Sequence, residues 1–139
     1  MEKAEFAKAL AAYVHAGQTD RAGKPYIEHP LAVAAQMDTE QERIVALLHD
    51  VLEDTAVTYD TLCNLFGAEI ADRVARLTHR EGESYMDYVR RVGEDPVTRK
   101  VKLADLRHNM DLSRLPAVTE EDLARLAKYQ QACEYLITL

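Results

Sequence analysis

The property of this chain that most restricts its fold is the spacing of its apolar residues, which follows the helical period in almost every long segment. No segment of four or more residues between turn signals alternates apolar and polar side chains as a β-strand does. The 139 residues show no internal repeat, linker or low-complexity tract. We therefore predict an all-α fold, with about seven to eight helices packed into one compact domain over residues 1–139.

Residues that start or stop helices divide the chain into elements. Pro30 suits the first position of a short helix, because its missing N–H would have no helical partner there. Thr58, Ser84 and Thr119 are of the types that cap a helix N-terminus, and Gly67 ends the helix that Thr58 begins. The predicted helices cover residues 2–15, 30–36, 40–53, 58–67, 68–78, a stretch after Ser84, a stretch from Pro96 and the stretch from Thr119 to the C-terminus, with a loop at 17–25.

The formal net charge of −7 argues against a protein that coats nucleic acid, because such binding needs a broad basic surface. No apolar run approaches the roughly 18–20 residues that cross a membrane, and residues 1–17 lack the pattern of a secretory signal. Cys63 and Cys133 are not spaced as a metal or redox motif, so we expect two buried, reduced thiols. These observations predict a cytoplasmic protein that binds a small molecule rather than a nucleic acid or a membrane.

One histidine and three acidic residues gather on the polar side of the predicted helix 40–53. His49 and Glu53 are one turn apart, and so are Asp50 and Asp54. Carboxylates at the C-terminal end of a helix repel one another and oppose the helix dipole, at a cost of about 0.3–1 kcal/mol each. A solvated acidic face is the ordinary explanation of such a cluster, but a bound divalent cation would remove both conflicts.

Two further segments carry weaker signals. In the helix that Pro96 opens, Lys102, Asp105 and Asn109 share one face, opposite an apolar stripe. An acid, an amide and a lysine on one face are ordinary surface composition. His29 alone indicates no more than a cap or a packed residue. Only the combination of the three segments points to a site.

The order of these residues is His29, then the adjacent pair His49–Asp50, then Asp105. This H…HD…D order is that of the HD phosphohydrolase superfamily. The surrounding words HAGQTDRAGKPYIEHPLAVA, ALLHDVLEDT, the FG of NLFGAEIADRV and KLADLRHNM resemble the hydrolase domain of its RelA/SpoT branch. The similarity runs from about residue 13 to residue 110, and the chain resembles the stand-alone small alarmone hydrolases.

The resemblance implies a helical HD domain that uses a manganese ion to hydrolyse the alarmones ppGpp and pppGpp. The 3′-pyrophosphate would be removed, leaving GDP or GTP. Two imidazoles and two carboxylates form a mixed N/O ligand set that suits manganese, iron, cobalt or zinc. The implied metal ligands are His29, His49, Asp50 and Asp105, the catalytic acidic pair is Glu53 and Asp54, and the substrate-binding residues are Arg21, Lys24, Lys102 and Asn109.

The chain departs from the family pattern at residues that the resemblance places near the guanine base of the substrate. Asp20 stands where the family has an arginine that lies against guanine, and Asp111 stands where a second arginine is usual. Arg21 is next along the loop, so we expect it to supply the missing contact and to preserve a preference for guanine. A looser base pocket that accepts other nucleotides is the alternative.

Three function classes stay open on the sequence. The first is the alarmone 3′-pyrophosphohydrolase, and the second is an HD phosphohydrolase that acts on another nucleotide or phosphate ester, which Asp20 favours. The third is a non-catalytic metal- or nucleotide-binding module, which the complete set of matching residues disfavours. A cyclic-dinucleotide phosphodiesterase of the HD-GYP kind is disfavoured because no GYP follows the HD pair.

The remaining histidines receive mostly structural interpretations. We expect His15 to tie the first helix to the loop and His79 to be solvated beside a helix end. His108 is on the same side of its helix as Asp105, so contact with a ligand and a plain surface position are both open.

Overall fold

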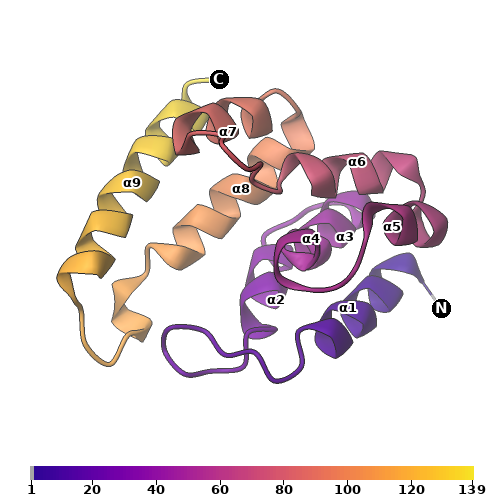
Figure 1. The fold of residues 1–139 in the computed structure, drawn as a ribbon, viewed down its shortest axis with the longest axis horizontal. Helices are drawn as coiled ribbons and strands as arrows, with labels where there is room; N and C mark the ends of the chain where they lie inside the picture. The colour runs from indigo at the N-terminus through magenta and orange to yellow at the C-terminus, as the bar shows by residue number, and fades with distance from the viewer. Residues whose placement is uncertain (1) are drawn as a thin grey trace.

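The computed structural model describes residues 2–139, and these residues form α-helices joined by short connections, with no β-strand among them (Figure 1). An isolated bridge between Thr19 and Pro25 narrows the loop after the first helix. This architecture confirms the all-α prediction. The helices are α1 (Lys3–Val14), α2 (Glu28–Ala34), α3 (Glu40–Leu48), α4 (Val51–Asp54), α5 (Tyr59–Phe66), α6 (Ala68–Arg76), α7 (Tyr85–Gly93), α8 (Pro96–Asn109) and α9 (Glu120–Ile137), with a 3₁₀ turn, η1 (Leu112–Arg114), between the last two.

The core forms around α3, whose last five residues, 44–48, are all buried. A helix that is apolar on almost every side needs neighbours on every side. The neighbours of α3 are α1, α2, α6 and α8. The most hydrophobic segment of the chain is therefore the fixed centre of the domain, and the HD pair follows directly at its C-terminal end.

The predicted caps are confirmed where they can be checked. The side chains of Thr58, Ser84 and Thr119 each accept a hydrogen bond from the backbone N–H three residues later. Gly67 ends α5 with a φ of 93°, a backbone conformation that L side chains rarely adopt. Pro30 does not open its helix, because α2 begins at Glu28, and Pro30 is the third helical residue. The shift is tolerated, since the first four N–H groups of a helix have no helical partner.

The prediction of one continuous helix over 40–53 is wrong. The chain leaves helical geometry at Asp50, where φ is −107° and ψ is 0°, and α4 then begins. The carbonyl of Ala46 binds both the backbone N–H of His49 (3.4 Å) and its ring Nδ1 (2.6 Å), which tightens the last turn of α3. Glu53 and Asp54 consequently lie in the single turn of a new four-residue helix rather than at the end of a long one.

The second half of the chain completes the domain around α8, which contacts α2 and α3 on one side and α9 on the other (Figure 1). No helix within residues 2–139 is long and apolar enough to cross a membrane. Cys63 and Cys133 are free thiols, and Cys133 is buried as expected. Cys63 is only half-buried, because Leu62 and Phe66 fill the centre of the buried face of α5 and leave it at the edge.

Candidate metal centre and active site

Four separate elements bring the H…HD…D residues together. His29 is the second residue of α2, His49 and Asp50 occupy the junction between α3 and α4, and Asp105 is on α8. His29 Nε2 lies 2.7 Å from Asp105 Oδ1, and His49 Nε2 lies 3.5 Å from the same oxygen. Asp50 Oδ2 is 3.0 Å from His49 Nε2. His29, His49 and Asp105 are buried, and one ligand atom from each lies within 4.8 Å of the others.

The orientation of the His49 ring makes this cluster suited to a cation. Its Nδ1 lies 2.6 Å from the carbonyl oxygen of Ala46 and donates a hydrogen bond to it, so Nε2 is the nitrogen that faces the cluster. That Nε2 is buried and has no hydrogen bond to the described residues, although it faces two carboxylates. A ring nitrogen whose proton a metal can replace, among carboxylate oxygens and beside a second imidazole, belongs to the donor set of a divalent transition metal.

The charges of the cluster are strongly coupled. Burial opposes protonation of His49, but the carboxylates of Asp50 and Asp105 outweigh it and raise the pKa of His49 well above its usual value. Burial also opposes ionisation of Asp105, but Lys102 and the two imidazoles lower the pKa of Asp105 well below its usual value. The cluster therefore keeps its carboxylates ionised and needs positive charge beside them.

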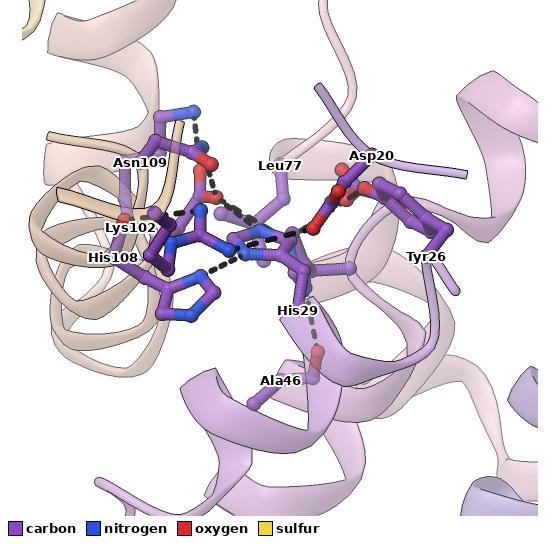
Figure 2. Close-up of polar contacts among 12 residues, drawn as sticks. Asp20, Tyr26, His29, Ala46, Leu77, Lys102, His108 and Asn109 are labelled. Carbon is purple, nitrogen blue, oxygen red and sulfur yellow. Dashed lines mark hydrogen bonds and ion pairs between the residues drawn. The ribbon is translucent and has the colours of Figure 1, made fainter. Parts of the chain in front are cut away.

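A second set of side chains fixes these ligands (Figure 2). Lys102 Nζ donates to Asp105 Oδ2 at 2.9 Å, and Asn109 Nδ2 donates to Asp105 Oδ1 at 3.0 Å. The ring of His108 stacks on His29, with 2.7 Å between their Nδ1 atoms. Figure 2 shows Lys102, His108 and Asn109 of α8 on one side of His29 and Tyr26 on the opposite side. The hydroxyl of Tyr26 donates to Asp50.

A cavity of about 360 Å³ opens beside the cluster, and His29, Asp50 and Asp105 form part of its wall. We call it the large cavity. The loop at 17–25, α8, η1 and α9 supply the rest of the wall. Lys102, Asn109 and Arg21 line it, and their role in substrate binding stays a prediction. Lys24 does not belong to the lining, and its backbone N–H instead donates to the carboxylate of Asp20.

Two ion pairs join the loop to the C-terminal part of the chain across this cavity. Asp20 Oδ2 lies 3.4 Å from Arg114 Nη1, and Arg21 Nη1 lies 2.6 Å from Asp122 Oδ1. Asp122 also accepts from Arg125 at 2.8 Å. We call the two pairs the loop clasp. Asp20, in the place of the family arginine, therefore positions an arginine from η1 at the cavity, a contact that sequence order could not reveal.

The expected catalytic acids lie close to the cluster but outside it. Glu53 Oε1 accepts from the backbone N–H of His79 at 2.5 Å, and burial raises the pKa of Glu53. Burial and the charge of Asp50 raise the pKa of Asp54. His79 is exposed, as expected, and it contacts Glu53 through its backbone N–H rather than through its ring.

The other two histidines can also be placed. His15 is buried and its Nδ1 lies 2.9 Å from Gln18 Oε1, which confirms that it ties α1 to the loop. His108 contacts His29, one of the proposed metal ligands, directly. Of the two interpretations left open, contact with a metal ligand therefore holds, and a plain surface position does not. Sequence reasoning missed several cavity residues, because they lie outside the quoted motifs on η1 and α9: Arg114, Asp122, Arg125 and Tyr129.

Comparison with known proteins gives a consistent assignment. Residues 7–127 match the family described as HD domain. The bifunctional (p)ppGpp synthase/hydrolase SpoT of Escherichia coli K12 is 38% identical over 116 residues, which cover 73% of this chain and 16% of that protein. The guanosine-3′,5′-bis(diphosphate) 3′-pyrophosphohydrolase of Aquifex aeolicus is 35% identical over 136 residues, which cover 89% of this chain and 19% of that protein. The chain thus spans less than a fifth of the length of these two relatives.

A solved structure supports the fold. The structure reported as a metazoan ortholog of SpoT that hydrolyses ppGpp superposes with a TM-score of 0.79, covering 98% of this chain and 85% of that one. Its sequence identity is 24%, so the comparison bears on the fold. The match to the HD-domain family over residues 7–127, most of the chain, shows that this chain belongs to that family.

Proposed function

We propose that this protein is a manganese-dependent 3′-pyrophosphohydrolase of ppGpp and pppGpp, which releases pyrophosphate and leaves GDP or GTP. The observation that carries the proposal is the buried cluster of His29, His49 and Asp105 in and beside the wall of a cavity large enough for a nucleotide. Relatives named for this reaction support the choice of substrate.

The proposed ion is held by His29, His49, Asp50 and Asp105. Manganese accepts mixed imidazole and carboxylate ligands, and its preference for oxygen suits a set with two aspartates. When bound, such an ion supplies Lewis-acid chemistry, withdrawing charge from phosphoryl oxygens and making water more acidic.

The side chains of this chain supply the rest of the reaction. Glu53 accepts a proton as the water oxygen bonds to phosphorus, and its raised pKa suits a group that takes up and releases protons. The bond from phosphorus to the ribose O3′ breaks, and O3′ gains a proton, which we assign to the carboxyl of Asp54 because burial and the charge of Asp50 raise its pKa. Lys102 and Asn109 hold Asp105 and line the large cavity, where their positive charge and N–H groups face phosphoryl oxygens.

The test is a substrate panel with manganese-loaded protein. We expect ppGpp and pppGpp to give GDP and GTP with release of pyrophosphate, followed by anion-exchange chromatography. Nucleoside triphosphates, monophosphates and NADPH should be hydrolysed far more slowly. Hydrolysis of one of these other compounds in preference to ppGpp would contradict the proposal and identify a different HD phosphohydrolase.

The second candidate, a phosphohydrolase with a looser choice of base, is favoured by the loop clasp. Arg21, the expected base contact, is engaged by Asp122, and Asp20 cannot stack on a base. We infer that Arg21 and Arg114 share the base side, because both line the large cavity. The ratio of kcat/KM for ppGpp to that for its adenine counterpart decides the question. A guanine preference that Arg21→Ala or Arg114→Ala weakens supports the alarmone, and equal rates support the looser enzyme.

A further inference from the structure

A second, smaller cavity of about 150 Å³ adjoins the large one. Lys102, Asn109 and Tyr129 line both cavities, so the two cavities meet at these three side chains. Lys102 and Asn109 are the same groups that hydrogen-bond Asp105. The small cavity therefore lies one side chain away from the proposed metal ligands.

One residue that lines the small cavity carries a polar atom that no described residue satisfies. Tyr85 is that residue, and its hydroxyl oxygen is buried and makes no hydrogen bond. Burial raises the pKa of Tyr85 to about 12, so the hydroxyl is protonated and can donate. A buried donor without an acceptor costs free energy that a ligand oxygen would recover.

The ionic groups of the small cavity favour an anion. Lys102 and Lys128 line it, against one carboxylate, that of Glu53, whose Oε1 already accepts from the backbone of His79. Lys128 Nζ lies 4.4 Å from the centre of the Tyr85 ring, so it lies over the face of the ring that carries the unsatisfied hydroxyl. Lysine is a point charge with several donors, which suits a phosphoryl group.

The two cavities differ in volume, and therefore in the kind of ligand that each can hold. Pockets for whole small molecules measure about 300–1,000 Å³, a range that includes the large cavity and excludes the small one. The arginines that can meet the base and the 5′-phosphates, Arg21, Arg114 and Arg125, line only the large cavity. What the small cavity can hold is a single charged group attached to a molecule in the large one.

We infer that the small cavity binds the terminal phosphoryl group of the diphosphate that is removed, with Tyr85 Oη and Lys128 Nζ as donors. The inference rests on the proposed function and extends it, because it makes the site selective for a 3′-diphosphate over a 3′-monophosphate. It also identifies inorganic pyrophosphate as a ligand with one phosphoryl group in each cavity, bound where the two cavities meet at Lys102 and Asn109.

The test is binding of inorganic pyrophosphate and inorganic phosphate by calorimetry, at one fixed free manganese concentration. We expect Lys128→Ala to weaken pyrophosphate binding about tenfold or more and Tyr85→Phe to weaken it severalfold. Phosphate binding should stay within twofold of wild type in both variants. Lys8→Ala, which removes an exposed lysine of α1, is the matched control and should bind both anions as wild type does.

Tyr85→Phe is the informative variant, since it removes one oxygen atom that has no partner and should leave the melting temperature unchanged or slightly higher. Unchanged pyrophosphate affinity in both variants would overturn the inference, even if the protein hydrolyses ppGpp. A raised KM for ppGpp in Lys128→Ala with unchanged pyrophosphate affinity would also overturn it, because the cavity would then hold the 5′-diphosphate. Failure to hydrolyse ppGpp would refute the proposed function alone, because the binding measurement does not depend on turnover.

Discussion

At the scale of single residues, neighbouring groups fix the orientation of the side chains that we propose as metal ligands. Ala46 fixes His49 through Nδ1, and Nε2 stays available. Asp105 is held by Lys102 and Asn109 while its Oδ1 faces both imidazoles. Such contacts fix ligand geometry before an ion binds and reduce the ordering cost of binding.

Asp105 is the residue on which the cluster depends most. It is the one carboxylate within reach of both imidazoles, so we expect Asp105→Ala to lose most of its manganese while wild type holds about one ion per chain. Metal analysis of the purified proteins measures this. Asp87→Ala, which removes an exposed acid of α7, serves as the control. Unchanged metal content in Asp105→Ala would remove Asp105 from the ligand set.

A substitution of Glu53 distinguishes a catalytic role from a role as metal ligand. Glu53→Gln keeps an oxygen that can accept from the backbone of His79, so the variant should fold normally and keep its metal. It loses the group that takes a proton from water, and we expect kcat to fall by about 10²–10⁴-fold. Glu81→Gln, on the exposed loop before α7, should keep the wild-type rate. Loss of metal in Glu53→Gln would show instead that Glu53 is a ligand.

At the scale of elements, the sequence predicted which segments are helical better than it predicted where a helix is interrupted. Caps and glycines mark most helix ends, because the free N–H and C=O groups there select particular residue types. The break at Asp50 carries no glycine or proline, and the apolar pattern continues through it to Val51, so periodicity could not reveal it. The motifs predicted the cluster on α2, α3 and α8, but Arg114 and Tyr85 reach the cavities by tertiary packing alone.

Arg91 of α7 joins two elements and gives a prediction about stability. Its guanidinium donates to the carbonyls of Arg76 and Thr78, at 2.8 and 2.9 Å, where α6 has ended, and to both oxygens of Glu83. We expect Arg91→Ala to lower the free energy of unfolding by about 2–3 kcal/mol in urea denaturation. Arg90→Ala, which loses only an exposed pair with its neighbour on the same helix, should cost about 0.5 kcal/mol or less. Equal effects of the two substitutions would show that the carbonyl contacts contribute nothing.

The same contact makes stability depend on pH. The hydrogen bonds from Arg91 lower the pKa of Glu83 from 4.5 to about 2. Since the folded pKa is lower than the unfolded one, the contribution is complete above about pH 5 and is lost as the pH falls through 4.5 towards 2. The melting temperature of Glu83→Gln should therefore fall less steeply than that of wild type between pH 5 and pH 2.5. Parallel curves would show that Glu83 does not contribute to the acid sensitivity of the fold.

At the scale of the whole molecule, the proposed ion is bound by residues from four elements and so couples their folding. Separated ligands gain affinity only when the chain is folded, and binding to the native state adds to its stability. We expect manganese to raise the melting temperature, by an amount that grows with the logarithm of its concentration above the dissociation constant. The same titration of Asp105→Ala should show little change. An equal rise in that variant would assign the effect to weaker surface sites.

The separation of the ligands along the chain also has a consequence during synthesis. His29 and Asp105 are 76 positions apart, and ribosomes add about 5–20 residues per second, so about 4–15 s pass between the appearance of the two side chains. The growing polypeptide has no complete coordination sphere during that interval. An ion bound by all four proposed ligands is therefore acquired only after α8 has been translated.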